Sequence, residues 1–165
     1  MWRKLHGLKC DLNESFKGNM AQIKKIMLLG HRGMVGKAIS RLLTKTNPSV
    51  ELVTVKKEDL DLRDKEKTLA FILTNKVDAI IVAAAKVGGI KFNDDFPVDF
   101  LNDNLEIALN VMSAAATANT AKLLYLGSSC IYPKNTRQPI QEEQLFSGPL
   151  ESTNEAYALA KIVGV

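Results

Sequence analysis

The chain has 165 residues, of which 46% are hydrophobic, and a net charge of +4 from 22 Lys and Arg against 18 Asp and Glu. These values suit one ordinary globular domain. The basic excess is too small to indicate a nucleic-acid-binding protein.

The sequence contains no candidate membrane span or secretory signal. Its longest apolar run, at 79–85, is far shorter than the roughly 20 residues that a spanning helix needs. Residues 1–22 are polar without an apolar core, so we expect a loose N-terminal extension, with Met20 as a candidate alternative start. Cys10 and Cys130 make no disulfide framework, which favours a reducing, cytoplasmic compartment. No Cys/His cluster has metal-ligand spacing, so we expect no metal site.

Strand and helix patterns alternate from residue 23 onward. The first elements are an apolar strand at 26–29, a helix at 34–45 with Val35, Ile39, Leu42 and Leu43 on one face, and a strand at 51–55. A helix at 64–75 with Leu69, Ile72 and Leu73 inward precedes an apolar strand at 79–82. A long helix at 98–119, a strand at 123–126 and a helix at 152–165, capped by Ser152 and Glu155, complete the pattern.

This alternation predicts an α/β fold, a Rossmann-like doubly wound parallel sheet with helices on both faces, spanning residues 23–165. Folds of this kind build about six strands, and four are present here, so we expect the sheet to be incomplete at its C-terminal side.

A glycine-rich turn joins the first strand to the first helix. Gly30, Gly33 and Gly36 are three residues apart, which suits a tight turn, a close backbone approach to a pyrophosphate and close helix–strand packing. A plain strand-to-helix turn is the alternative. The position after the first strand of an alternating pattern favours a dinucleotide site.

The end of the second strand bears on cofactor choice. NAD-selective enzymes usually place an acid there, whereas this chain has Lys56 and Lys57, and Arg32 lies in the glycine turn. These cations could surround a 2′-phosphate, which favours NADP(H), although a solvated basic loop is the alternative. Asp61 and Leu62 follow where such folds commonly hold the adenine.

Tyr157 and Lys161 are one helical turn apart, and a nearby Lys cation should bring the tyrosine pKa down toward the working range. A chance surface pair is the alternative. The pair gains weight from Ser128, which follows the fourth strand at the carboxyl edge of the sheet, where ligands bind in this architecture.

This ordered set resembles the extended short-chain dehydrogenase/reductase family. Within it, the blocks at 30–36, 83–90, 126–133 and 153–161 are similar to the GDP-L-fucose synthases. The resemblance implies a reductase triad of Ser128, Tyr157 and Lys161, with Cys130 as the base for epimerisation. It also implies NADP(H) as cofactor, GDP-4-keto-6-deoxymannose as substrate and a homodimer. The residues expected to hold the cofactor are Gly30, Arg32, Gly33, Met34, Val35, Gly36, Lys57, Asp61, Leu62, Ala83, Ala84, Tyr157 and Lys161.

The chain also departs from that family. Ala156 stands where a proline usually precedes the catalytic tyrosine, and Lys rather than Arg ends the second strand. Family members carry a further substrate domain, so we expect a truncated chain that binds cofactor weakly without turnover, and a fraying Tyr157–Lys161 face. The alternatives are another nucleotide-sugar epimerase or dehydratase of the same fold and a non-catalytic dinucleotide-binding remnant.

Overall fold

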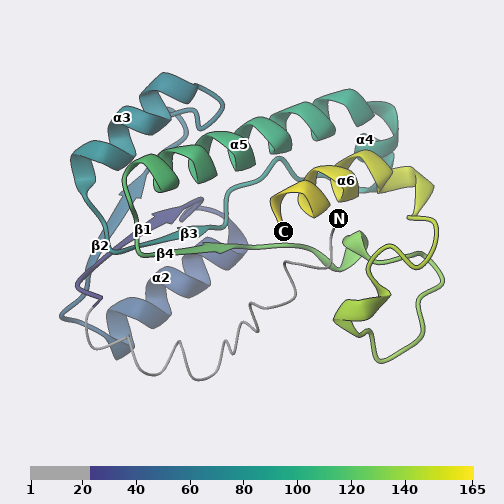
Figure 1. Ribbon diagram of the computed structural model, residues 1–165, viewed down its shortest axis with the longest axis horizontal. Coiled ribbons are helices and arrows are strands. Elements are labelled where there is room, and N and C mark those ends of the chain that lie inside the picture. Colours follow the sequence, from purple (N-terminus) through teal and green to yellow (C-terminus); the bar gives the residue numbers. More distant parts are fainter. Residues whose placement is uncertain (1–22) are drawn as a thin grey trace, which may run out of the picture.

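A four-stranded parallel sheet organises the computed structural model, which describes residues 23–165 (Figure 1). The expected extension at 1–22, with Met20 and Cys10, lies outside the described residues. The strands are β1 (Lys25–Leu29), β2 (Glu51–Val55), β3 (Ala79–Val82) and β4 (Lys122–Tyr125), in the order β2-β1-β3-β4. The direction of winding reverses between β1 and β3, and a ligand crevice is expected beyond that point at the carboxyl edge.

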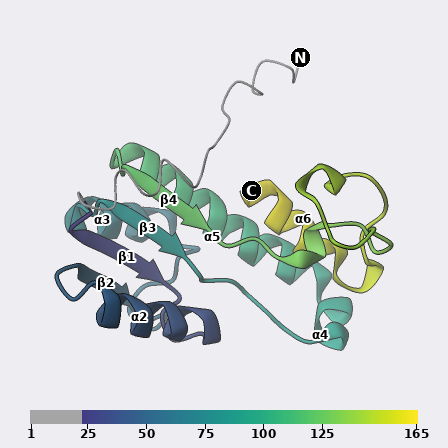
Figure 2. The same cartoon turned by 90° about the horizontal axis from the view of Figure 1, so that it is seen from below.

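Helices cover both faces of the sheet. They are α2 (Met34–Thr46), α3 (Lys65–Asn75), α4 (Ile90–Asp95), α5 (Pro97–Thr117) and α6 (Glu155–Gly164). Helices α3 and α5 lie on one face and α2 on the other, while α6 packs along α5 (Figures 1 and 2). Three short 3-10 turns are η2 (Ser129–Ile131), η3 (Glu142–Gln144) and η4 (Ser152–Asn154). No helix within residues 23–165 is long and apolar enough to cross a membrane.

The main core lies between the sheet and the pair α3 and α5. Met27, Leu29, Ile80 and Val82 are fully buried there, with Ile72 of α3 among their neighbours. Strands in the centre of a parallel sheet are covered on both faces, so their residues are apolar without alternation. The burial of β1 and β3 therefore confirms the interpretation of the apolar runs as central strands.

The expected strands and long helices are present with nearly the same bounds, but three details were wrong. Helix α4 was not predicted, because a short helix carries too little periodicity to stand out from a loop. Leu73 was expected to point inward and is 41% exposed. The capping box is absent: Ser152 lies in η4, where its hydroxyl donates to Glu151, and the α-helix begins at Glu155.

Helix α6 is packed against the rest of the domain at the Tyr157–Lys161 face. Ala158, Ala160 and Lys161 are buried, and the helix packs along α5. Short helices gain most of their stability from tertiary packing, which the expectation of fraying left out of account.

The turn after β1 is in direct contact with the loop after β3. Gly30 has φ +87°, and a Cβ on it would lie 2.5 Å from the Ala84 nitrogen. A Cβ on Gly36 would overlap the Gly30 carbonyl oxygen. The glycines therefore let helix α2 start directly against the strand, as their spacing predicted.

We expect Gly36→Ala to lower the free energy of unfolding by about 1–2 kcal/mol. The overlap is with backbone, so overpacking of about 1–3 kcal/mol outweighs the roughly 1 kcal/mol that Ala gains over Gly in a helix. Urea unfolding measures the change. Gly33→Ala is the control, since its Cβ would lie 3.4 Å from the Gly30 oxygen, an ordinary contact. An unfolding midpoint for Gly36→Ala at or above that of the unmodified chain would contradict the prediction.

Candidate active site

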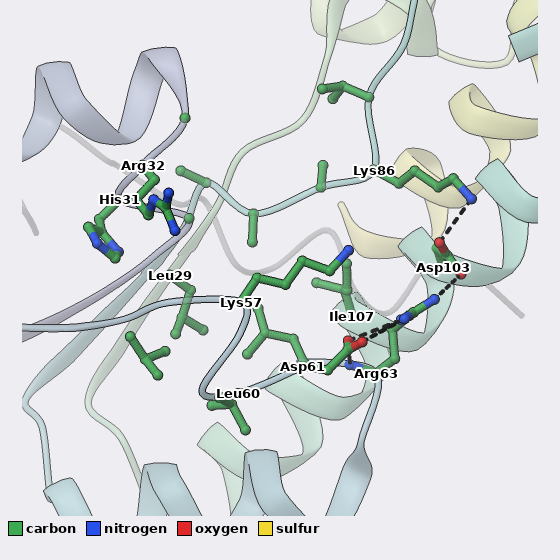
Figure 3. A pocket seen from close by; sticks show the side chains of 18 of the residues that line it. Leu29, His31, Arg32, Lys57, Leu60, Asp61, Arg63, Lys86, Asp103 and Ile107 are labelled. Atoms are coloured by element: carbon green, nitrogen blue, oxygen red, sulfur yellow. Dashed lines mark hydrogen bonds and ion pairs between the residues drawn. The ribbon is translucent and has the colours of Figure 1, made fainter. Parts of the chain in front are cut away.

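A pocket of about 700 Å³ lies at the carboxyl ends of β1, β2 and β3 (Figure 3). Eight of the residues expected to hold a cofactor line it, namely Gly30, Arg32, Gly33, Lys57, Asp61, Leu62, Ala83 and Ala84. The other five, Met34, Val35, Gly36, Tyr157 and Lys161, do not. The structure thus brings the three segments predicted from the sequence to one site.

The pocket has features that suit a dinucleotide. Its apolar lining includes Leu29, Val55, Leu60 and Ile107, which could contact a base. No side chain caps the start of α2 at Gly33, so the first N–H groups of the helix are open to an anion. The exposed side chains of Met34 and Val35 point to a role for their backbone rather than their side chains.

The charges at the end of β2 differ from the sequence interpretation. Glu58 also lines the pocket, and both its carboxylate oxygens accept hydrogen bonds from Arg32 Nη1, at 3.0 and 2.9 Å. Lys57 lines the pocket, whereas Lys56 does not. An acid therefore does stand near the end of this strand, and the predicted group of three cations is wrong in that respect.

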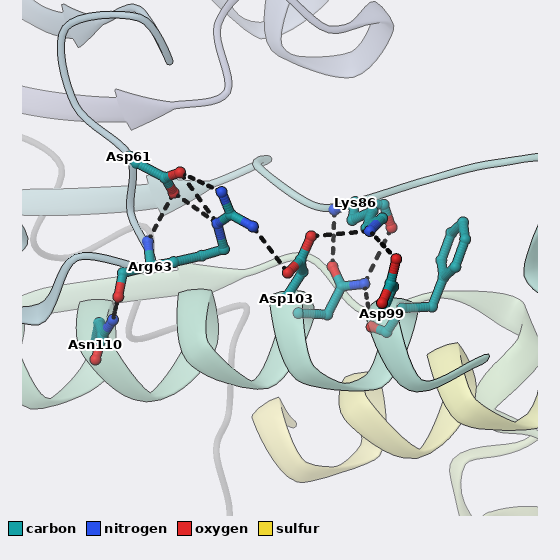
Figure 4. A network of polar contacts seen from close by, with 8 residues as sticks. Asp61, Arg63, Lys86, Asp99, Asp103 and Asn110 are labelled. Atoms are coloured by element: carbon teal, nitrogen blue, oxygen red, sulfur yellow. Dashed lines mark hydrogen bonds and ion pairs between the residues drawn. The ribbon is translucent and has the colours of Figure 1, made fainter. Parts of the chain in front are cut away.

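A chain of ion pairs runs along one side of the pocket (Figure 4). Arg63 binds Asp61 at 2.6 Å and Asp103 at 3.0 Å, and Asp103 in turn binds Lys86 at 3.1 Å. Lys86 also reaches Asp99 at 3.4 Å. Asp61, expected beside the adenine, thus has its carboxylate engaged by Arg63, and the network ties the loops after β2 and β3 to helix α5.

Asn104 of α5 fixes the loop after β3. Its side chain is buried; Oδ1 accepts from the Lys86 backbone N–H at 2.9 Å, and Nδ2 donates to the carbonyls of Lys86 and Phe100 at 3.0 and 2.8 Å. Lys86 lies in a loop, where no neighbouring strand can bond to its backbone. The Asn104 side-chain amide bonds to that backbone instead.

The expected catalytic residues form a second cluster at the same edge of the sheet. Ser128 follows β4, and the Cys130 thiol donates to its Oγ at 3.1 Å. Ser128 also neighbours Tyr157 of α6, where it acts to lower the pKa of the phenol. The hydroxyl, the thiol and the phenol therefore lie in one cluster around Ser128.

Lys161 is 3% exposed and donates through Nζ to the Leu126 carbonyl at 3.0 Å. Nζ lies 4.5 Å from the centroid of the Tyr125 ring and 5.9 Å from that of Tyr157. Burial lowers the pKa of Lys161, an effect that Cys130 opposes electrostatically.

The pKa of Tyr157 shifts in the direction opposite to the one predicted. Burial raises it first, the neighbouring Cys130 adds to the rise, and the hydrogen bond with Ser128 works against it. The expected lowering by Lys161 is wrong for this structure, because desolvation of the phenolate dominates.

Phe100 links the two clusters. Its ring is fully buried, lies 5.6 Å from Lys86 Nζ and meets the Tyr157 ring edge-on with centroids 6.4 Å apart. One aromatic side chain of α5 therefore lies next to both Lys86, which lines the pocket, and Tyr157 of the second cluster.

Sequence reasoning missed Glu58, Arg63, Lys86, Asp103 and Asn104. For Asn104 a signal was present, since it falls on the buried face of helix α5 with Phe100, Ala108 and Val111, and a buried amide in such a face needs partners. The ion pairs join distant parts of the sequence, so no local pattern marks them.

We expect Asn104→Leu to lower the free energy of unfolding by about 2 kcal/mol, because it leaves the Lys86 N–H and carbonyl without their side-chain partner. Urea unfolding gives the value. Asn102→Leu, at an exposed position of the same helix, is the matched control and should change little. Equal effects of the two substitutions would contradict a specific role for Asn104.

The ion pair of Asp61 predicts a pH dependence of stability. The pKa of Asp61 is lowered to about 2, first by its hydrogen bonds with the Arg63 side chain. Its stabilising contribution is full above the ordinary value of 3.8 and is lost as the pH falls through about 2. Asp61→Asn should therefore cost about 1 kcal/mol at neutral pH, since the pair is partly exposed and screened, and the difference should vanish in acid. Urea unfolding as a function of pH tests this, and a difference that stays constant across the series would refute it.

Comparisons with known proteins agree with this geometry. The chain is 49% identical over 142 residues to a GDP-L-fucose synthase of Sinorhizobium fredii, covering 86% of this chain and 45% of that protein. It is 44% identical over 138 residues to a GDP-L-colitose synthase of Yersinia pseudotuberculosis, covering 84% of this chain and 44% of that protein. A GDP-L-fucose synthetase of Naegleria fowleri solved with NADP bound aligns with a TM-score of 0.76 and 29% identity, over 85% of this chain and 41% of that one.

The chain thus spans less than half the length of these relatives. Residues 26–165 match the model of the NAD dependent epimerase/dehydratase family. With the glycine turn at the carboxyl edge of a parallel sheet, this match shows that the chain belongs to the NAD dependent epimerase/dehydratase family.

Proposed function

We propose that this chain carries the cofactor site and the proton-transfer residues of a GDP-L-fucose synthase. The reaction is the NADPH-dependent 3,5-epimerisation and 4-reduction of GDP-4-keto-6-deoxy-D-mannose to GDP-L-fucose. The observation that carries the proposal is the cluster of Ser128, Cys130 and Tyr157 beside Lys161, in which the Cys130 thiol is hydrogen-bonded to Ser128. The similarity to GDP-L-fucose synthases supports the choice of substrate. The proposal includes a cytoplasmic homodimer, which the family resemblance implies.

The pocket residues would hold NADP(H) in an extended form. The start of α2 at Gly33 would receive the pyrophosphate, and Lys57 with Arg32 would face the 2′-phosphate. When bound, the reduced nicotinamide supplies a hydride to the C4 carbon of the sugar. The NADP-bound structure of a similar synthetase supports this cofactor.

The side chains would divide the proton transfers. Protons at C3 and C5 are alpha to the C4 ketone, and the Cys130 thiolate would remove them during epimerisation. Ser128 would donate a hydrogen bond to the ketone oxygen, and Tyr157 would donate the proton that this oxygen takes up on reduction. The Lys161 cation would hold the nicotinamide ribose close to Tyr157.

A second candidate is the same chemistry on another GDP-sugar. The similarity to a GDP-L-colitose synthase favours it, because that relative is nearly as close in sequence as the first. Cys130 and Tyr157 would act alike on both substrates, so substrate preference in a competition assay separates the two candidates.

The two chemical steps should be separable by substitution. Tyr157→Phe should slow NADPH oxidation about 100-fold, since the proton donor is lost. It should leave solvent deuterium exchange at C3 and C5 near normal. Cys130→Ala should have the opposite primary effect and slow the exchange about 100-fold. Both variants are measured at the full natural length of the protein, with GDP-4-keto-6-deoxymannose as the substrate. Mass spectrometry follows deuterium exchange at C3 and C5, and absorbance follows the oxidation of NADPH.

Each variant serves as the control for the other. Exchange at the normal rate in Cys130→Ala would assign the base to another residue. Absence of both exchange and NADPH oxidation in the unmodified protein would refute the proposed function.

A further inference from the structure

The salt bridge between Arg32 and Glu58 places a carboxylate beside the cation best placed for an anionic ligand. Arg32 lies two residues after Gly30 in the turn that follows β1, and Glu58 lies three residues beyond the end of β2. Both side chains line the pocket. A ligand that reaches Arg32 therefore meets Glu58 as well.

Two other cationic side chains of the pocket are already paired with carboxylates. Arg63 is held by Asp61 and Asp103, and Lys86 by Asp103 and Asp99. Among the lining residues that the structure describes, Lys57 alone has a cationic side chain without a carboxylate within ion-pair distance. An incoming phosphate can therefore bind Lys57 and the N–H groups of Arg32 that Glu58 does not occupy. Figure 3 shows the Lys57 and Arg32 side chains in the pocket.

The geometry of the pair argues against a role for Glu58 in orienting Arg32. A carboxylate that fixes a guanidinium does so through two parallel bonds to two nitrogens. Here both oxygens of Glu58 accept from the single Nη1 of Arg32. The Arg32 side chain is 61% exposed and the Glu58 side chain 67%. Such an exposed pair is weak and exchanges readily with other partners.

A 2′-phosphate bound to Arg32 would lie close to the Glu58 carboxylate. The two like charges repel each other, and the phosphate must also compete with Glu58 for Nη1. A cofactor with a free 2′-hydroxyl brings no charge to this point, so Glu58 would not oppose it.

We propose that Glu58 is a specificity-determining residue that weakens the preference of the pocket for a 2′-phosphorylated dinucleotide by competing for Arg32. This inference rests on the proposed cofactor site. Lys57 and Arg32 attract the phosphate, Glu58 opposes it, and the observed discrimination between NADPH and NADH is the balance of the two.

The test is Glu58→Gln, which removes the charge and keeps the side-chain size. Its dissociation constant for NADPH should fall about five-fold at low salt, while that for NADH stays unchanged. The NADPH effect should shrink as salt is added, because the groups are exposed. Fluorescence titrations of the purified protein with both cofactors at two salt concentrations give these values.

Asp59→Asn is the matched control. It removes the same charge from the neighbouring residue, which neither lines the pocket nor pairs with Arg32. Its affinity for both cofactors should equal that of the unmodified protein.

The outcomes are distinct. Weaker NADPH binding by Glu58→Gln would show that Glu58 positions Arg32, and an unchanged value would show that it plays no part; either overturns this inference while the cofactor site stands. A gain in NADPH affinity of the same size in Asp59→Asn would reduce the effect to net charge and also overturn it. No binding of either cofactor to the unmodified protein would refute the cofactor site itself.

Discussion

The contact between two backbone segments at the carboxyl edge of the sheet determines the rest of the site. The turn at Gly30 meets the loop at Ala83 and Ala84, and the Ala83 N–H donates to the Leu29 carbonyl at 2.9 Å. A side chain at Gly30 or Gly36 would force these segments apart. With them in contact, the start of α2, the end of β2 and the loop after β3 open onto one pocket, and this is the point at which the strand order reverses.

Beyond Ala83 the loop after β3 has no neighbouring strand to bond with. Helix α5 supplies hydrogen-bond and ion-pair partners in place of a strand. Asn104 satisfies the backbone of Lys86, while Asp103, one residue earlier on the same helix, pairs with its ammonium group. The same aspartate pairs with Arg63 from the loop after β2. One turn of α5 therefore fixes two of the three segments around the pocket, and Phe100 on the preceding turn reaches Tyr157.

The sequence predicts the parts of this arrangement that depend on local rules. Uninterrupted apolar runs predicted the strands, and glycine spacing predicted the turn. The order of Ser128, Tyr157 and Lys161 predicted that these residues lie together at one edge of the sheet. The pairing of Arg32 with Glu58 depends on how the loop after β2 folds back, which no spacing rule describes. The pKa of Tyr157 depends on how deeply the phenol is buried, which the spacing of a tyrosine and a lysine does not reveal. That spacing therefore predicted the wrong direction for the pKa shift.

The state of Tyr157 at the start of the proposed reduction follows from its ordinary pKa of 10.0. In the proposed direction the ketone oxygen must receive a proton, so the phenol has to be protonated at the start of the step. The ordinary pKa of 10.0 already keeps the phenol protonated at neutral pH, and burial raises that pKa further, which makes the phenol a weaker acid. Lys161 does not counter this rise, because its Nζ is held by the Leu126 carbonyl and lies closer to the Tyr125 ring than to the Tyr157 ring. Ser128 acts in the opposite direction: it lowers the pKa of Tyr157 and so favours the phenolate that remains once the proton has left. In the proposed mechanism the half-buried Tyr157 is therefore the proton donor, and Cys130, which donates a hydrogen bond to Ser128, is the base.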